Sequence, residues 1–333
     1  MLKVGLIGGG GIANAHIRGY AANADKIKIA AVADAVEATA EKRGTELGAT
    51  AYTDYAQMIK EEQDLDAVDI CLPHHLHADA IIAAAEAGLN ILCEKPLCLT
   101  AEEAKRVSAA VKDNKVTLMS AHNQLFMPTV AKAKELLDSG VIGPVYEVRT
   151  TDSFFNNFDP ANMGWRAHVE TAGGGELIDT GYHPSYLLLT LAGGVPVEAT
   201  AMLATHRLTF SEAEDSAQVL VRFDNGVIGQ LVTSWAYQPA AITERFSAVG
   251  ELGSLYADGS TLSYRLRDGK EETFTFDPVD TFAAEIGHFA HCLETGERPP
   301  HTEDEGIQVL GMILAAYESA KNKTIAPVLN VLA

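Results

Sequence analysis

The sequence predicts an α/β protein with two domains: a doubly wound parallel sheet, followed by an α+β domain with a large, open-faced and mostly antiparallel sheet. Three observations predict this fold. Short apolar runs alternate with amphipathic stretches over roughly the first third of the chain, strand-like segments dominate afterwards, and 333 residues exceed the usual size of a single core. We expect the domains at residues 1–121 and 122–333.

The strands of the first domain are predicted from short apolar runs bounded by turn or charge signals, as buried parallel strands are. These runs are Val4–Ile7, Ile27–Ala33, Ala67–Leu72, Asn90–Cys93 and Thr117–Ala121. The segments between them are rich in Ala and Glu and carry apolar residues at helical spacing. The expected helices are Ala13–Ala24, Val36–Leu47, His77–Ala87 and Thr100–Lys112. Repeated strand and helix units of this kind wind a parallel sheet.

The second domain is predicted to begin with one helix, at Pro128–Ser139, and to continue mainly with strands. The expected strands are Val145–Asp152, Val197–Thr205, Ala217–Phe223, Val227–Trp235, Leu262–Arg267 and Thr273–Phe276. Asp224-Asn225-Gly226 and Asp268-Gly269 are typical hairpin connections. Two helices are expected at the end of the sequence, and the capping-box pattern at Thr302–Glu305 predicts the start of the last one.

The charge balance excludes several kinds of partner. Lys and Arg total 25 against 45 Asp and Glu, a formal net charge of -20, which repels phosphate backbones and anionic lipid. We therefore expect neither a nucleic-acid nor a membrane partner, and any anionic ligand must be held locally by backbone N–H groups. The four cysteines have no metal-type spacing and are expected to be reduced. With neither a signal peptide nor a spanning apolar run in the sequence, we expect a cytoplasmic protein.

A glycine cluster follows the first predicted strand and opens the first helix. Gly8-Gly9-Gly10-Gly11-Ile12-Ala13 fits the pattern G-x-G-x-x-A, in which glycines let the backbone approach a pyrophosphate at a helix N-terminus. We expect the cofactor to contact Gly8, Gly10, Gly11, Ile12 and Ala13. A glycine turn without a ligand is the alternative.

Asp34 ends the second predicted strand, at the spacing from this loop where an acid accepts hydrogen bonds from the adenine ribose. A 2'-phosphate would meet this carboxylate, and no Lys or Arg follows until Lys42 and Arg43. The cofactor is therefore expected to be NAD, with NADP the weaker choice. Asp34 can also cap the helix that begins near Val36.

Glu94-Lys95-Pro96 follows another strand, at the sheet edge where doubly wound folds bind ligands. A lysine ammonium there is suited to hydrogen bonding to, or proton exchange with, a substrate hydroxyl. A surface ion pair before a proline is the alternative.

These motifs, together with a second glycine-rich segment at 173–183, resemble the glucose-fructose oxidoreductase, inositol dehydrogenase and MocA (Gfo/Idh/MocA) family over almost the whole chain. The matching landmarks are Gly8–Ala13, Asp34, Asp54-Tyr55, Pro73, His77, Ala87–Leu97 and Gly173–His183. The resemblance implies a Rossmann domain, a C-terminal open-faced sheet, a tightly held nicotinamide cofactor, and sugar- or cyclitol-like substrates between the domains. It places Lys95, Asp179 and His183 on catalytic positions, and it implies a cis Lys95–Pro96 bond. It also places Pro73, His74, His77 and Glu94 beside the cofactor.

Asp179 and His183 are four residues apart, so both side chains share one face if the segment is helical. Oxidation of a secondary alcohol needs a base for the hydroxyl proton, and imidazole suits that task. We expect His183 to be the base. Asp179 would orient it, stabilise the imidazolium or hold a neighbouring substrate hydroxyl, and without the family a helix-surface pair is the simpler interpretation.

Further residues are candidates for contact with the substrate, and one histidine cluster is a candidate metal site that we exclude. Trp165, Arg166, Asn123 and Tyr182 are expected near the substrate, with a loop anchor as the alternative for Trp165 and Arg166. The histidines of His74-His75-Leu76-His77 resemble a metal cluster, but they follow a strand at the ligand edge of the sheet. We therefore expect no metal site.

Two positions depart from the family pattern. Leu125 stands where many relatives carry arginine, and Tyr186 stands where an aspartate often follows the catalytic histidine by three residues. These apolar and aromatic side chains suggest a substrate with a less polar portion, such as a glycoside aglycone.

The combined prediction is an NAD-dependent oxidoreductase that oxidises a secondary hydroxyl of a sugar, cyclitol or glycoside. One alternative uses transient oxidation for elimination, epimerisation or glycoside cleavage without net redox change. Another is a regulatory protein that senses NAD or sugar. An open sheet with one uncovered face favours a homo-oligomer, a dimer or a tetramer.

Overall fold

The computed structural model describes residues 1–237 and 244–329. The chain forms two compact units. Unit 1 comprises Met1–Asn123 and Asp280–Ile307, and unit 2 comprises Gln124–Val279 and residues 308–329. The chain therefore returns to unit 1 over residues 280–307 and then re-enters unit 2, a return that the expected limits 1–121 and 122–333 do not include.

Unit 1 is built on a six-stranded parallel sheet with strand order β3-β2-β1-β4-β5-β6. Its strands are β1 (Leu2–Ile7), β2 (Ile27–Ala33), β3 (Thr50–Tyr52), β4 (Ala67–Ile70), β5 (Asn90–Glu94) and β6 (Leu118–Ala121). The order reverses between β1 and β4, and open sheets of this type bind ligands at the carboxyl ends of the strands beside that reversal. The predicted doubly wound sheet is confirmed.

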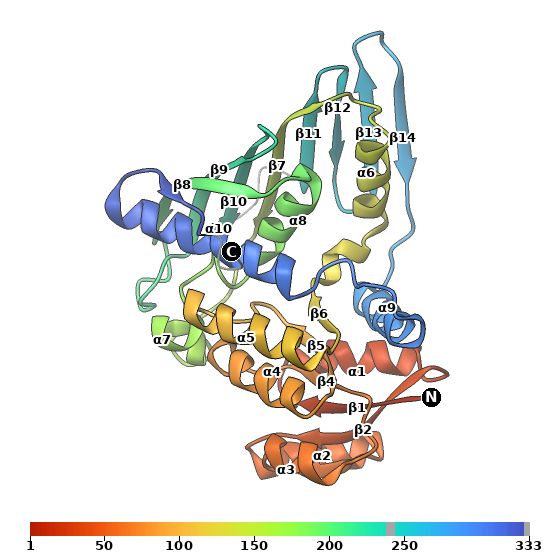
Figure 1. Cartoon of the computed structure of the whole chain (residues 1–333). Coiled ribbons are helices and arrows are strands. Elements are labelled where there is room, and N and C mark those ends of the chain that lie inside the picture. The colour runs from red at the N-terminus through yellow and green to blue at the C-terminus, as the bar shows by residue number, and fades with distance from the viewer. Residues whose placement is uncertain (238–243, 330–333) are drawn as a thin grey trace. The chain divides into compact units, whose positions relative to one another are not determined.

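Helices connect these strands, as the periodicity predicts for all but the one at residues 55–61. They are α1 (Ala13–Ala22), α2 (Glu37–Leu47), α3 (Tyr55–Glu61), α4 (His77–Glu86), α5 (Ala101–Asn114) and, from the returning segment, α9 (Thr281–Thr295) (Figure 1). A capping box starts α5, where Thr100 accepts from the Glu103 N–H at 3.1 Å and Glu103 accepts from the Thr100 N–H at 3.2 Å. Helix α9 packs closely on α1, because a side chain at Gly19 would lie 2.9 Å from the Phe282 carbonyl oxygen.

Unit 2 contains a nine-stranded sheet with order β14-β13-β12-β11-β7-β10-β9-β8-β15, in which β7 and β10 are parallel and the other neighbours are antiparallel. The strands are β7 (Val145–Ser153), β8 (Pro196–Ala204), β9 (Ser216–Phe223), β10 (Ile228–Ser234), β11 (Phe246–Gly250), β12 (Gly253–Ala257), β13 (Thr261–Leu266), β14 (Glu271–Thr275) and β15 (Ala326–Pro327). The open-faced, mostly antiparallel sheet is confirmed. Strands β11 and β12 were not predicted. Each has only five residues and contains glycine, so the alternation of apolar and polar residues is too short to indicate a strand.

The helices of unit 2 cover one face of this sheet. They are α6 (Pro128–Asp138), α7 (Val169–Ala172), α8 (Tyr182–Ala192) and the part of α10 (Glu303–Asn322) that follows residue 307, with short 3-10 turns η2 (Asn123–Phe126) and η3 (Gly164–Ala167). Nearly every residue of α8 is buried. The predicted box at the start of α10 forms, since the Thr302 N–H donates to Glu305 at 2.9 Å.

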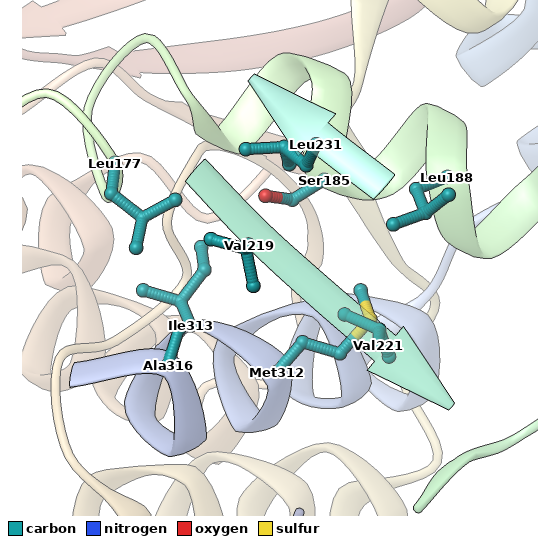
Figure 2. A pocket seen from close by; sticks show the side chains of 9 residues that line it. All are labelled: Leu177, Ser185, Leu188, Val219, Val221, Leu231, Met312, Ile313 and Ala316. Atoms are coloured by element: carbon teal, nitrogen blue, oxygen red, sulfur yellow. The ribbon is translucent and has the colours of Figure 1, made fainter. Parts of the chain in front are cut away.

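A small cavity lies where α8 and α10 pack on β9 and β10 (Figure 2). Its lining is apolar apart from Ser185, whose hydroxyl donates to the Gly181 carbonyl at 2.7 Å. Such a lining offers a ligand no polar group to orient it, so this cavity is part of the core.

The opposite face of the sheet is left open. Register places four exposed apolar side chains on it, and they are Met202, Leu220, Val249 and Tyr256. Within the two described ranges, no helix combines the length and the apolar character needed to span a membrane.

Candidate cofactor and catalytic sites

The glycine loop lies at the carboxyl end of β1, beside the reversal of strand order. Gly8 has φ +97° and a side chain there would lie 2.5 Å from the Cys71 carbonyl oxygen, so only glycine fits. Gly10 and Gly11 are exposed, and a side chain at either would meet nothing within 4 Å. Helix α1 has neither a side-chain cap nor an acid in its first turn. This open, uncapped helix start fits a dinucleotide pyrophosphate.

Asp34 lies at the end of β2 and faces this loop. Its carboxylate accepts the Gly9 N–H at 2.8 Å and the Val36 N–H at 2.9 Å. Arg43 also reaches the loop, donating from Nε to the Gly9 carbonyl at 3.0 Å. The distance of Arg43 along the chain is therefore no measure of its distance from the ribose position, and that part of the sequence argument against NADP is wrong.

Lys95 and Glu94 lie in the turn after β5, and the Lys95–Pro96 bond is cis as expected. Lys95 is half-buried, and its N–H donates to the Glu94 carboxylate at 3.0 Å. His77 is fully buried at the start of α4, with Nδ1 2.6 Å from the Pro96 carbonyl oxygen and Nε2 2.7 Å from that of Leu72. Burial lowers the pKa of His77. The ring lies between the lysine turn and the end of β4, and in its neutral form it donates to one of these two carbonyl oxygens.

A buried network of charged side chains supports the turn that contains Glu94 and Lys95. His16 of α1 is inaccessible to solvent, with Nδ1 2.8 Å from Asp69 of β4 and Nε2 3.1 Å from Glu94. Burial opposes a charge on His16, but the adjacent Asp69 carboxylate outweighs it and raises the pKa of His16 well above its usual value. The imidazolium therefore donates to both carboxylates.

Two further groups face this network. Cys71 lies 3.7 Å from Asp69, and burial raises the pKa of the Cys71 thiol to about 12. Potential ligand atoms of His16, Asp69 and Cys71 lie within 4.8 Å of one another, but the hydrogen bonds to carboxylates already use both imidazole nitrogens. Glu285 of α9 is also fully buried, and neither carboxyl oxygen has a hydrogen-bond partner among the described residues. Burial raises the pKa of Glu285 well above its usual value.

In unit 2, Asp179 is paired with Arg166. Arg166 Nε donates to the Asp179 carboxylate at 2.6 Å, and the guanidinium lies over the Trp165 ring at 4.2 Å. Asp179 is buried, whereas Trp165 and Arg166 are half-buried on η3. Helix α8 starts at Tyr182, so Asp179 lies in the turn before it, and the condition that one helix carries Asp179 and His183 is not met.

His183 lies in the first turn of α8 and contacts Tyr186 one turn later. Its Nδ1 is 2.8 Å from the Tyr186 hydroxyl oxygen, and the rings meet edge-on. Tyr186 is fully buried, so its ring presents no exposed surface here, and a substrate with a less polar portion stays a prediction. Leu125, the other residue of that prediction, is half-buried.

Glu176 lies inside the second glycine-rich segment and is fully buried. Burial raises the pKa of Glu176 well above its usual value, which favours the neutral carboxyl group. It contacts the Thr233 hydroxyl, which lies 2.9 Å from the Asp152 carbonyl oxygen. A neutral carboxyl group can donate a hydrogen bond to the Thr233 hydroxyl, while that hydroxyl donates to the Asp152 carbonyl oxygen. This segment is tightly packed, because a side chain at Gly175 would overlap the Glu214 backbone.

The other residues predicted to contact the cofactor or the substrate differ in burial and in their partners. Pro73 precedes η1 (His74–Leu76), and His74 is buried with its ring 6.0 Å from that of His77. Asn123 donates to the Thr281 hydroxyl at 2.9 Å. Tyr182 is fully buried against Tyr186.

Sequence reasoning missed two contributors. His16 gave no signal, since its partners Asp69 and Glu94 are 53 and 78 residues away. Tyr186 was noted as a departure from the family, and its three-residue spacing from His183 was the signal for a contact on one helix face.

The parallel sheet with its open glycine loop defines a nicotinamide-dependent oxidoreductase. Residues 2–122 match the model of the oxidoreductase family with an NAD-binding Rossmann fold, and residues 130–256 match the GFO/IDH/MocA C-terminal domain. The chain belongs to the Gfo/Idh/MocA family.

Several characterised proteins are similar along most of their length. The chain is 34% identical over 309 residues to D-xylose 1-dehydrogenase (NADP(+)) 2 of Haloferax volcanii, covering 90% of this chain and 92% of that protein. It is 28% identical over 337 residues to scyllo-inositol 2-dehydrogenase (NAD(+)) of Bacillus subtilis, covering 96% and 94%. The structure of levoglucosan dehydrogenase in complex with NADH matches with a TM-score of 0.90 at 28% identity, covering 98% of this chain and 99% of that one.

Proposed function

We propose that this protein is an NAD-dependent dehydrogenase that oxidises a secondary hydroxyl of a sugar, cyclitol or glycoside. The observation that carries the proposal is the open glycine loop at the reversal of strand order, with the Asp34 carboxylate directly beside it. The similar xylose, inositol and levoglucosan dehydrogenases support the substrate class.

The choice of NAD rests on Asp34. Its carboxylate would accept hydrogen bonds from ribose hydroxyls and would repel a 2'-phosphate. Arg43 beside Gly9 acts in the opposite direction, because a guanidinium attracts phosphate. One similar dehydrogenase is named for NAD and another for NADP, so both cofactors belong in every assay.

When bound, the nicotinamide cofactor supplies the hydride acceptor. Lys95 donates a hydrogen bond to the reacting hydroxyl and polarises it, and His183 accepts the hydroxyl proton. Asp179, with Arg166, holds a neighbouring substrate hydroxyl through charge-assisted hydrogen bonds. The network of His16 and His77 keeps the Lys95 turn in place.

The decisive experiment incubates purified protein with NAD or NADP and a panel of cyclitols, aldoses and glycosides. Reduced nicotinamide is followed by absorbance and products by mass spectrometry. Accumulation of NADH with one substrate supports the proposal. Product without NADH indicates internal hydride return, and tight NAD binding with no turnover of any panel member contradicts the proposal.

Variants then test the roles of the two acid-base residues. Lys95→Ala and His183→Ala are expected to lower kcat by about 10²-fold or more, the usual contribution of a positioned acid or base, while NAD affinity measured by calorimetry is retained. Lys134→Ala and His291→Ala are the controls, because both side chains form exposed ion pairs on helix surfaces. Loss of NAD binding in the first pair would assign those residues structural roles.

The uncovered sheet face with Met202, Leu220, Val249 and Tyr256 supports self-association. A homo-oligomer stays a prediction.

A further inference from the structure

The hydroxyl of Tyr186 lies between two nitrogen atoms. It is 2.8 Å from His183 Nδ1, and it accepts the backbone N–H of Gln124 at 3.1 Å. All three residues belong to unit 2, and Tyr186 and His183 are separated by one turn of α8. The contact is therefore set by local helix geometry together with η2.

The surroundings fix this hydroxyl in place. The Tyr186 side chain is fully buried, with its ring edge-on to Tyr182 at 6.5 Å. Gln124 is anchored as well, because Arg245 donates to its side-chain oxygen at 2.8 Å and also pairs with Asp152 at 3.5 Å. The Tyr186 oxygen can accept a hydrogen bond from Nδ1 or donate one to it, and the tautomer of the His183 ring decides which.

The chemistry of imidazole then restricts the useful arrangement. A neutral ring has one N–H, and a ring that accepts a proton at Nε2 must carry its own hydrogen on Nδ1. That Nδ1–H needs an acceptor, and the Tyr186 oxygen lies at hydrogen-bonding distance from it. A phenolic oxygen that accepts the Gln124 N–H retains capacity to accept a second donor.

We infer that Tyr186 is a positioning residue, whose hydroxyl oxygen accepts the Nδ1–H of His183 and so leaves Nε2 as the unprotonated nitrogen that takes the substrate proton. The inference rests on the proposed function, in which His183 is the base. The proton of the substrate hydroxyl moves to Nε2 as hydride leaves the carbon for the cofactor. The ring then carries both hydrogens, and the Tyr186 oxygen still accepts from Nδ1.

A neutral hydroxyl and a carboxylate differ in their effect on His183 when they accept a hydrogen bond from its Nδ1. Both accept from Nδ1, but a carboxylate adds an ion pair that holds the imidazolium after proton transfer. The Tyr186 contact orients the ring without that added charge, so the histidine returns its proton more readily between turnovers.

The first test reads the tautomer directly. Long-range ¹H–¹⁵N spectra of histidine side chains distinguish rings protonated at Nδ1 from those protonated at Nε2, and His183→Gln assigns the signal. We expect the Nδ1–H form in the unaltered protein and the Nε2–H form in Tyr186→Phe. An Nε2–H ring in the unaltered protein overturns the inference without any substrate being known.

The second test uses turnover. Tyr186→Phe is expected to lower kcat by about tenfold or more, a part of what a general base contributes, while KM and NAD affinity stay within about twofold. Tyr264→Phe is the matched control, since it removes a tyrosine hydroxyl that donates to Glu272 on the outer strands. Equal melting temperatures check that both variants fold.

The outcomes separate this inference from the proposed function. Loss of turnover in His183→Ala with full turnover in Tyr186→Phe overturns the inference and leaves the proposed function in place. Full turnover in His183→Ala overturns the base role of His183, and with it the positioning role of Tyr186, whatever the tautomer, while the dehydrogenase assignment stands. Absence of NADH formation with every panel member contradicts the dehydrogenase assignment itself. Loss of turnover in both, with the expected tautomer change, supports both.

Discussion

His16 in unit 1 and His183 in unit 2 show how the neighbours of a histidine decide its role. His16 is buried between Asp69 and Glu94, and the Asp69 carboxylate raises the pKa of His16 well above its usual value, which favours the charged ring. His183 is half-buried, and its Nδ1 faces a neutral hydroxyl. A histidine locked between two charges cannot exchange protons during a reaction, whereas one held by a neutral oxygen can.

The buried acids of the two units follow the same rule. Asp69 and Glu94 have a cation beside them, whereas Glu285 and Glu176 each bury a carboxyl group whose pKa is raised by burial. A cation in contact with a buried carboxyl group favours its charged form, whereas burial by itself favours the neutral form.

The largest expected effect comes from removing the cation of the closed network. His16→Leu leaves Asp69 and Glu94 buried without their partner, and should lower the free energy of unfolding by about 3–5 kcal/mol. His183→Leu should lower it by about 1 kcal/mol or less, because that ring is half-buried and its partner is neutral. Urea unfolding of both variants measures the difference, and equal losses would contradict the comparison.

A smaller effect of opposite sign is expected at Glu285. Glu285→Met replaces a carboxyl group without hydrogen-bond partners in the described structure by an apolar side chain, and should raise the free energy of unfolding by about 1–3 kcal/mol at pH 8. Glu294→Met on the exposed side of α9 is the control and should change little. A loss of stability in Glu285→Met would mean that the carboxylate is charged and paired.

A further expected effect is a dependence of stability on pH. Because the raised pKa of His16 keeps a proton on the folded protein that the unfolded chain releases above about pH 6.5, this contribution is complete below that pH and is lost above it. The raised pKa values of Glu176 and Glu285 act in the same direction.

Each such proton lowers the free energy of unfolding by up to about 1.4 kcal/mol per pH unit between the unfolded and folded pKa values. Urea titrations at pH 7, 8 and 9 measure the slope, and His291→Gln, an exposed histidine, should leave it unchanged. A stability that rises over this range would show that His16 is neutral in the folded protein.

The sequence by itself determined the order of most elements in unit 1, the glycine loop and the turn at Lys95, but not β3, α3 or the helix that carries His183. The features that it determined depend on apolar periodicity, glycine and proline chemistry, and spacings of a few residues, all of which are local. The short strands β11 and β12 escaped prediction because their patterns are too brief to stand out from their surroundings.

Only the tertiary structure decided which charged groups meet. It brought His16 to Asp69 and Glu94, placed Glu285 from the far end of the chain against them, set Arg43 beside Gly9, and paired Asp179 with Arg166. The physical reason is that backbone conformation follows from local sterics, whereas the protonation of a side chain depends on burial and on charges that only the folded chain brings within a few ångströms.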